Sequence, residues 1–292
     1  MKKVNLATLK VTKPIDLKKI KTTLDLGDSE EKIEEKMIKV RQKLSKLQEK
    51  MYAHGKYAVL VCLQGMDTSG KDSLIREVFK SFNTRGIVVH SFKVPTDLEL
   101  HHDYLWRHYL ALPARGEFGI FNRTHYENVL VTRVHPEYIL GEHLPNALSL
   151  DDVNDTFWSQ RFEQINNFEK HLSENGTIIF KFFLNLSKNE QKERLLRRLE
   201  KHEKNWKFSP DDMKERELWE RYQECYQDAI NRTSTSYAPW HIIPADDKAT
   251  ARYLVAKVLF NTLKTYKDIK EPELNDAVKA HLIQYKQKLR KE

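Results

Sequence analysis

The chain has 292 residues, 40% of them hydrophobic and 32% charged, enough for one large α/β domain or two small ones with a sizeable core. A formal net charge of +8 favours polyanionic partners: nucleic acid, anionic lipid or phosphate-rich small molecules. Two cysteines exclude a disulfide framework, the N-terminus lacks the apolar run of a signal peptide, and no apolar stretch approaches the ~20 residues of a membrane span. We therefore expect a cytoplasmic protein with no membrane partner.

The first predicted helix follows an irregular, basic lead-in over residues 1–27. It begins near Asp28, with Glu31 as its capping partner, and ends at Gly55. Its apolar residues recur at steps of three and four, and they are Ile33, Met37, Val40, Leu44, Leu47 and Met51. Such a stripe favours a helix that packs on the main body, with a subunit contact as the alternative. We treat residues 1–55 as this N-terminal unit.

Beyond Gly55 strands and helices alternate, in what we predict to be one domain over 56–270 and a C-terminal helix over 271–292. The predicted strands are 57–64, 86–92, 116–122, 176–186 and a short one within 238–247. The predicted helices are 71–82, 98–112, 157–172, 187–202, 211–231, 248–266 and 272–290. This alternation predicts a three-layer α/β/α sandwich around a five-stranded parallel sheet.

The segment LQGMDTSGKDS at 63–73 carries the first chemical signal. Gly65, Gly70 and Lys71 fit the P-loop pattern G-x-x-x-x-G-K, between a predicted strand and a predicted helix. We therefore predict the P-loop kinase fold for the domain over 56–270, with a lid at about 187–231. The glycines of the P-loop let backbone N–H groups face phosphate oxygens, while Lys71 supplies a cation. The alternative is a glycine-rich turn without a ligand. The expected phosphate-binding residues are Gly65, Met66, Asp67, Thr68, Ser69, Gly70, Lys71, Asp72 and Ser73.

Two positions depart from an ordinary P-loop enzyme. Asp72 replaces the hydroxyl that binds Mg²⁺ after the lysine, and Asn122 ends the third strand where an acid is usual. A hard cation still needs oxygen ligands, and Asp67 can supply a carboxylate from the loop itself. We therefore predict Asp67 as the principal Mg²⁺ ligand and Asn122 as a neutral helper. The simpler interpretation of Asp72 is a helix cap.

A second cluster follows the third strand, in the segment FNRTHYENVLVTRVH. Arg123 should project at the carboxyl edge of the sheet, where it could clamp phosphate, or else pair with a carboxylate at a helix edge. His125 is expected to be structural, because transfer between phosphates needs no strong base. The predicted contacts to the acceptor nucleotide or to phosphates are Asp103, Arg107, Glu127, Asn128 and Arg133.

The segment 187–231 is predicted to be a basic helical hairpin. Its cations Arg194, Arg197, Arg198 and Lys201 recur at steps of three and four and so share one helix face. Interleaved glutamates make part of this an ordinary solvated face, but a P-loop nearby favours a lid that closes over a polyanion. Core packing is the favoured role of the aromatic stripe Trp219, Tyr222 and Tyr226, over base stacking.

Several segments together resemble the polyphosphate kinase 2 family, from about Leu47 to Leu263. They are GMDTSGKDS, SFKVPTDLELHHDYLWRHY, EFGIFNRTHYENVLVTRVHPEY, NWKFSPDD and TSTSYAPWHIIPADDK. Many members end the third strand in Asp-Arg-Ser-Trp-Tyr, whereas Asn122-Arg123-Thr124-His125-Tyr126 is similar to the subgroup usually called class III. The resemblance implies a thymidylate-kinase-like fold with a lid, and reversible, Mg²⁺- or Mn²⁺-dependent transfer from inorganic polyphosphate to AMP and ADP, giving ADP and ATP. It also implies a homo-oligomer, a tetramer or a dimer.

The family's functional residues match positions of this chain. The resemblance implies site roles for Asp67, Lys71, Asn122, Arg123 and Glu127, and lid roles for Arg194, Arg198 and Lys207. Two rival interpretations remain at this point. An ATP-dependent nucleoside monophosphate kinase would share the fold but usually keeps the hydroxyl after the lysine. A nucleic-acid-binding module would leave the P-loop unexplained, so we expect no nucleic-acid partner.

Overall fold

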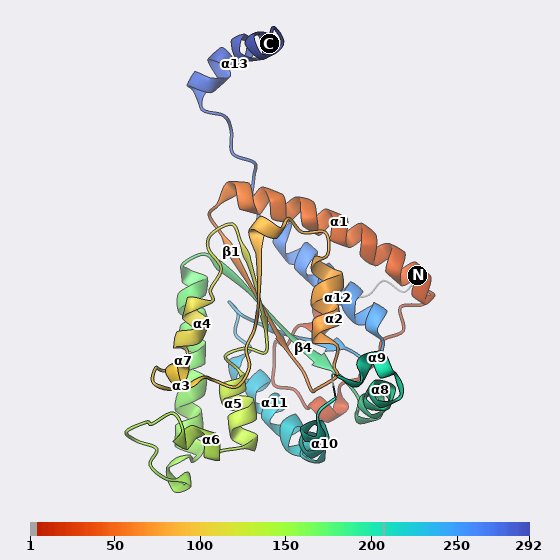
Figure 1. The fold of residues 1–292 in the computed structure, drawn as a ribbon, viewed down its shortest axis with the longest axis vertical. Helices are drawn as coiled ribbons and strands as arrows, with labels where there is room; N and C mark the ends of the chain where they lie inside the picture. Colours follow the sequence, from red (N-terminus) through yellow and green to blue (C-terminus); the bar gives the residue numbers. More distant parts are fainter. Residues whose placement is uncertain (1–4, 207) are drawn as a thin grey trace.

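The computed structural model describes residues 5–206 and 208–292. Its centre is a five-stranded, all-parallel sheet in the order β2-β3-β1-β4-β5, which confirms the predicted fold class (Figure 1). The strands are β1 (Ala58–Gln64), β2 (Ile87–Ser91), β3 (Phe118–Asn122), β4 (Thr177–Asn185) and β5 (Trp240–Pro244). In the parallel register Leu63 of β1 pairs with Asn122 of β3, so the P-loop and Arg123 leave the same edge of the sheet.

Each predicted helix has a counterpart near its range, but the helices at Glu127–Val134 and Glu137–Leu140 were not predicted. The helices are α1 (Glu30–His54), α2 (Lys71–Phe79), α3 (Asp97–Leu100), α4 (Trp106–Leu110), α5 (Glu127–Val134), α6 (Glu137–Leu140), α7 (Asp155–Glu174), α8 (Lys188–Glu200), α9 (His202–Asn205), α10 (Pro210–Glu217), α11 (Trp219–Thr233), α12 (Lys248–Leu263) and α13 (Asp276–Leu289). Short 3-10 turns occur at Leu6–Leu9, Leu17–Lys19, Thr84–Gly86 and Leu150–Asp152. Helices α1, α2 and α12 share one core cluster with the sheet, while α5, α7 and α11 pack in another, so helices cover both faces.

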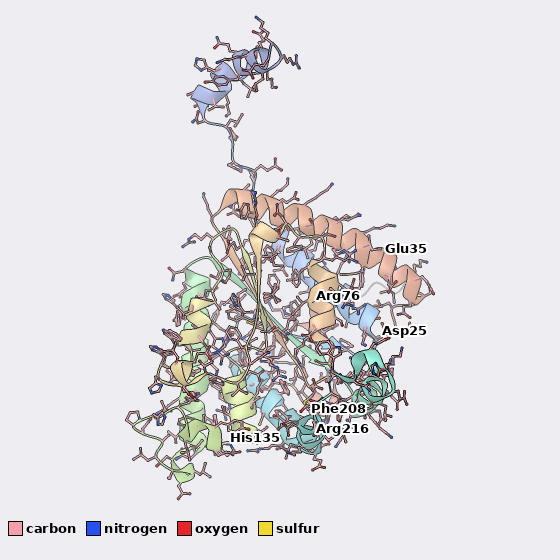
Figure 2. All side chains as sticks on the ribbon, viewed as in Figure 1. Asp25, Glu35, Arg76, His135, Phe208 and Arg216 are labelled. Atoms are coloured by element: carbon pink, nitrogen blue, oxygen red, sulfur yellow. The ribbon has the colours of Figure 1, made fainter. Side chains whose placement is uncertain are left out.

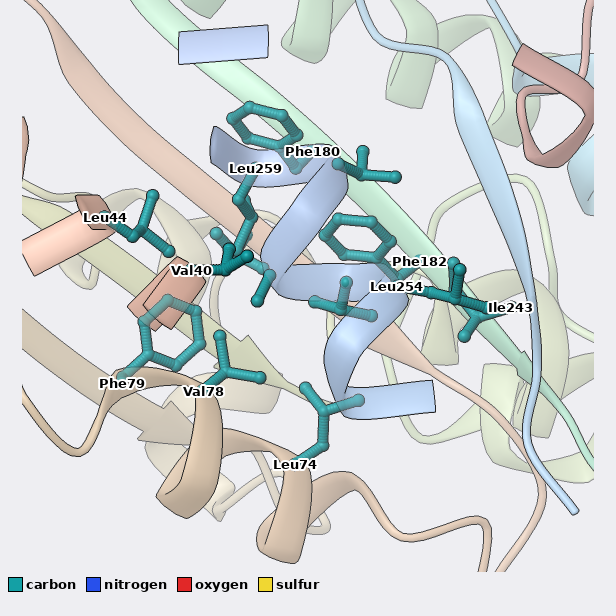
Figure 3. Packing of buried hydrophobic residues seen from close by; sticks show 14 of the residues in the cluster. Val40, Leu44, Leu74, Val78, Phe79, Phe180, Phe182, Ile243, Leu254 and Leu259 are labelled. Atoms are coloured by element: carbon teal, nitrogen blue, oxygen red, sulfur yellow. The ribbon is translucent and has the colours of Figure 1, made fainter. Parts of the chain in front are cut away.

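The core between the sheet and α12 shows why these sequences fold together. Every residue of β1 is buried, as expected for a central parallel strand covered on both faces. Leu254 and Leu259 of α12 lie among sheet residues and side chains of α1 and α2 (Figure 3). By contrast, polar side chains such as Glu35 and Arg76 occupy the outer surfaces of α1 and α2 (Figure 2). Helix α12 therefore fixes the position of α2, whose first turn completes the P-loop.

Helix α1 packs on the main body, as its apolar stripe predicted. Ile33, Met37 and Val40 are buried in the cluster that includes α12, and Gly55 ends the helix with φ +63°. The predicted start is wrong by two residues, because Ser29 is the N-cap and the helix begins at Glu30. Asp28 instead forms ion pairs with Lys32 and Lys36.

Two predicted helices are each divided in the structure. The range 98–112 contains α3 and α4, separated by a turn in which the Asp103 carboxylate accepts a hydrogen bond from the backbone N–H of Leu105 at 2.9 Å. This side-chain bond offers the backbone an alternative to a continuous helix. The range 211–231 contains α10 and α11, divided at Leu218. The aromatic stripe of α11 is buried, which confirms its packing role.

Helix α13 stands clear of the main body and buries no residue (Figure 1). No helix in the described ranges combines the length and the apolar composition that a bilayer crossing requires. Both cysteines, Cys62 and Cys225, are buried and unbridged.

Candidate active site

The P-loop joins β1 to α2 with a backbone that needs its glycines. Gly65 has φ +152° and Gly70 has φ +102°, both in the region that L side chains rarely adopt. A Cβ on Gly65 would lie 2.9 Å from the Leu184 carbonyl oxygen of the neighbouring strand β4. The loop therefore combines a left-handed bend with close backbone approach at the N-terminus of α2, the geometry that directs N–H groups at an anion.

Lys71 lies inside this loop, with its ammonium against the backbone. Its Nζ donates hydrogen bonds to the carbonyl oxygens of Gly65 at 2.7 Å and Met66 at 3.3 Å. Burial and the nearby Arg123 guanidinium lower the pKa of Lys71 to about 8, although neighbouring carboxylates, Asp67 first among them, act in the opposite direction. A bound phosphate would favour the charged ammonium, because an opposite charge at this distance raises a lysine pKa.

Asp67 connects the P-loop to the helical hairpin. Its carboxylate oxygen Oδ2 accepts a hydrogen bond from Arg198 Nη1 of α8 at 3.0 Å, and the side chain is about one-third exposed. The same Nη1 lies 3.2 Å from Oδ2 of Asp212, at the start of α10. One arginine nitrogen therefore bridges an acid of the loop and an acid of the hairpin.

Asp212 is a site residue that the sequence reasoning missed. Burial and the Asp67 carboxylate raise its pKa, which indicates two acids competing for one cation. In the sequence, Asp212 ends the segment NWKFSPDD, where it forms a capping box with Ser209. This local helix-capping role accounts for the acid, so the sequence alone does not indicate its contact with Arg198.

Asn122 ends β3 beside the P-loop with one of its polar atoms unused. Its Nδ2 donates to Asp72 Oδ1 at 2.7 Å and to Ser91 Oγ at 3.3 Å. Its Oδ1 is buried and, among the described residues, has no hydrogen-bond donor. The helix-cap interpretation of Asp72 is wrong, because Gly70 is the N-cap of α2 and Asp72 instead accepts the Asn122 amide from the first turn of that helix. A buried oxygen without a donor is suited to a cation or to a ligand hydrogen.

Arg123 is exposed at the carboxyl edge of the sheet. Its backbone has φ +59°, and its side chain makes no ion pair or hydrogen bond to any residue of the described ranges. Partial burial of the guanidinium opposes its charge, but the carboxylates of Glu127 and Asp67 outweigh that effect and raise the pKa of Arg123. Its guanidinium therefore remains charged and available to an anion.

A buried network supports the turn that follows Arg123. Lys181 of β4 and Glu169 of α7 are both fully buried, with Nζ and Oε2 2.6 Å apart. Glu169 Oε1 also accepts a hydrogen bond from the Tyr126 hydroxyl at 2.7 Å and lies 3.1 Å from His125 Nε2. The structural role expected for His125 agrees with these contacts. The sequence signal was the one lysine within the apolar strand FKFFLNL.

Glu127 and Arg107 lie near the carboxyl edge of the sheet. Glu127 Oε1 accepts a hydrogen bond from Gln64 Nε2, at the end of β1, at 2.9 Å. Arg107 lies with its guanidinium carbon 5.1 Å from the ring centroid of Phe92 and its Nε 3.3 Å from Glu99. Burial lowers the pKa of Arg107, and the charges of Glu99 and Glu127 counteract that effect. Both side chains are therefore in electrostatic contact with the site.

Other predicted residues have local or structural partners. Asp103 caps its own turn, and the Asn128 amide donates to the His125 carbonyl at 3.1 Å. Arg133 pairs with Asp228 of α11 at 2.6 Å, and its guanidinium lies over aromatic rings of α7. It is thus held between helices instead of beside the P-loop.

The predicted lid cations differ in their burial and in their partners. Arg194 is buried, and its guanidinium donates to the carbonyl oxygens of Thr68 at 2.9 Å and Ser69 at 3.1 Å. Its other nitrogens bond Ala245, Asp246 and Glu190. Arg194 therefore stabilises the P-loop through its backbone carbonyl oxygens, whereas Arg198 pairs with the Asp67 carboxylate. Lys207 lies outside the described residues.

A P-loop at the end of the central strand of a parallel sheet, together with a helical hairpin whose arginine contacts it, defines a P-loop kinase. The family model of Polyphosphate kinase 2 (PPK2) matches residues 27–271. The chain belongs to this family.

Relatives of known name support the assignment over most of the chain. The chain is 43% identical over 278 residues to the ADP-polyphosphate phosphotransferase of Rhodopseudomonas palustris, covering 95% of each chain. It is 47% identical over 225 residues to the AMP/ADP-polyphosphate phosphotransferase of Meiothermus ruber, covering 77% of this chain and 79% of that relative. The crystal structure of Polyphosphate Kinase 2 from Arthrobacter aurescens superposes with a TM-score of 0.86 at 33% identity, covering 96% of this chain and 97% of that one.

Proposed function

We propose that this protein transfers phosphoryl groups reversibly from inorganic polyphosphate to AMP and ADP, forming ADP and ATP. The observation that carries the proposal is an acid inside the phosphate loop, Asp67, bridged by a hairpin arginine to a second acid. The names of two relatives, an ADP- and an AMP/ADP-polyphosphate phosphotransferase, support the donor and both acceptors.

The proposed transfer follows from the charges around the loop. Loop N–H groups and Lys71 hold the terminal donor units, and Arg123 clamps the phosphoryl group in flight. An anionic oxygen of the acceptor phosphate forms the new P–O bond, while the terminal P–O bond of the donor breaks and its electron pair stays on the shortened chain. Arg198 exchanges its carboxylate partners for phosphate oxygens as the hairpin closes. Glu127 orients the acceptor.

The residues also fit a divalent cation, Mg²⁺ or Mn²⁺. The Asp67 carboxylate and the unpartnered Oδ1 of Asn122 are the hard oxygen donors that such a cation prefers. When bound, the cation would neutralise charge on the donor and acceptor phosphates. We further propose that the enzyme is a cytoplasmic homo-oligomer, a dimer or tetramer, which light scattering on the purified protein would test.

The direct experiment supplies AMP and long-chain polyphosphate without ATP and follows the nucleotides by chromatography. ADP and then ATP should appear, in amounts that depend on the polyphosphate added. A protein that makes ADP from AMP and ATP, but nothing from AMP and polyphosphate, is instead an ATP-dependent nucleoside monophosphate kinase.

The role of the loop acid has its own test. Asp67→Asn should reduce kcat by about 10²-fold or more, because a neutral amide cannot replace a charged cation ligand. It should also weaken Mn²⁺ binding measured by electron paramagnetic resonance. Asp211→Asn is the matched control, since Asp211 is exposed and pairs with Lys214. Unchanged turnover and unchanged Mn²⁺ binding in Asp67→Asn would show that the cation is held elsewhere.

A further inference from the structure

A small pocket adjoins the P-loop on the side away from Asn122 and Arg123. It lies among the P-loop, α2 and α12, and its lining includes Ser69, Gly70, Ser73, Ala245, Lys248 and Arg252. The sheet order explains the separation, because β3 carries Arg123 on one side of β1, while β4 and β5 lie on the other. The segment after β5 leads directly to Lys248, the first residue of α12. The pocket, about 10 Å³ in volume, therefore marks the face of the phosphate loop that Lys248 and Arg252 flank.

Two of the cations at this pocket, Lys248 and Arg252, have no carboxylate partner among the described residues. Lys248 is exposed and makes no ion pair or hydrogen bond to the residues that the structure describes. Partial burial and the charges of Arg194, Arg197 and Arg252 lower the pKa of Lys248 to about 8, and Glu190 opposes this shift. Arg252 Nε is buried with no hydrogen-bond acceptor within the described ranges.

The acids near this cluster are already engaged. Glu190 accepts hydrogen bonds from both Arg194 and Arg197, each at 2.8 Å. Asp246 accepts from the Ser187 backbone at 2.8 Å, and Asp247 caps α12 through the Thr250 N–H. Glu77 pairs with Arg76 at 3.0 Å. Like charges this close disfavour one another, and a bound anion would relieve the repulsion.

We propose that Lys248 and Arg252 bind the part of a linear polyphosphate donor that extends beyond the units held by the P-loop. This inference rests on the proposed function. A donor polymer must leave the loop on one side, and the side of Arg123 is needed by the acceptor nucleotide. The pocket offers cations at the other side, and the N-terminal ends of α2 and α12 add partial positive charge.

The test compares donors of different length on Lys248→Gln, Arg252→Gln and the double variant. For long-chain polyphosphate we expect Kd and KM to rise about tenfold for each residue changed. The slope of log Kd against log salt should fall by about one for each cation removed. Tripolyphosphate affinity and KM for AMP should stay within about twofold of the unmodified enzyme, because those ligands need not reach the pocket.

Lys264→Gln is the matched control, an exposed lysine at the C-terminal end of the same helix, with Nζ 5.7 Å from the Phe260 ring centroid. Equal losses for tripolyphosphate and the long chain, or no loss for either, would overturn the proposal. If Arg252→Gln lowers the urea midpoint, the exposed Lys248→Gln decides the outcome alone. An unmodified enzyme that uses no polyphosphate would overturn the proposed function itself, and a length-independent response in an active enzyme overturns only this inference.

Discussion

The buried pair Lys181–Glu169 allows a sharp test of how the site is supported. Lys181 Nζ donates to Glu169 Oε2 at 2.6 Å, to the Tyr126 hydroxyl at 2.8 Å and to the Thr233 carbonyl at 2.7 Å. Lys181→Met keeps an unbranched side chain of similar length and removes the charge. It leaves a buried carboxylate whose main counter-charge is gone.

The expected loss of stability is large for a single substitution. Removing one partner of a buried ion pair costs about 3–5 kcal/mol. With a urea m-value of roughly 3 kcal/mol/M, the unfolding midpoint should fall by about 1 M or more. Lys214→Met is the control, because Lys214 is 76% exposed beside an exposed Asp211, and its midpoint should not move measurably. Lys181→Met combined with Glu169→Met should recover part of the loss, since no charge is then left unpaired.

The pH dependence distinguishes lost charge pairing from lost packing. Burial alone would raise the pKa of Glu169, but the Lys181 ammonium and the His125 hydrogen bond outweigh it and lower that pKa. The ionised carboxylate therefore stabilises the unmodified enzyme above the unfolded pKa, and this stability is lost as pH falls. In Lys181→Met burial dominates and raises the pKa, so the variant loses stability as pH rises. The difference between the two midpoints should narrow from pH 8 to pH 5, and a constant difference would refute the reasoning.

Three further predictions concern catalysis. Asn122→Asp replaces the amide donor 2.7 Å from the Asp72 carboxylate, so kcat/KM for AMP and for ADP should change by different factors; equal changes would show that Asn122 does not set the acceptor preference. The pKa of about 8 for Lys71 predicts that kcat/KM for polyphosphate falls as pH rises above 8. At saturation kcat should persist to higher pH, because bound phosphate favours the charged ammonium. A flat kcat/KM profile from pH 7 to about pH 9.5 would contradict this prediction. Arg198→Ala should lower kcat by about 10²-fold or more. The control is Lys192→Ala, which changes an exposed residue of the same helix and should alter kcat by a few-fold at most. Equal effects of the two substitutions would argue against a special role for Arg198.

Much of the fold followed from short-range patterns. Largely apolar strands, the P-loop between β1 and α2, and the alternation of strands and helices sufficed for a five-stranded parallel sheet. These signals are local, because a strand and a glycine turn are encoded by adjacent residues. The predictions missed α5 and α6, and they did not anticipate the helix interruptions at Asp103 and Leu218. A side-chain bond explains the first break, and nothing in the structure explains the second.

The sequence by itself determined which chemical groups are present at the loop: two glycines, a lysine and an acid within seven residues. Only the tertiary structure decided their partners. Helical periodicity places Arg194 and Arg198 on one face of α8, but packing buries the first against backbone carbonyls and directs the second to Asp67. Arg133 likewise pairs with Asp228, across 95 residues of sequence. The physical reason is that periodicity fixes the direction of a side chain, whereas the opposing charge comes from a distant segment whose position depends on how the helices pack.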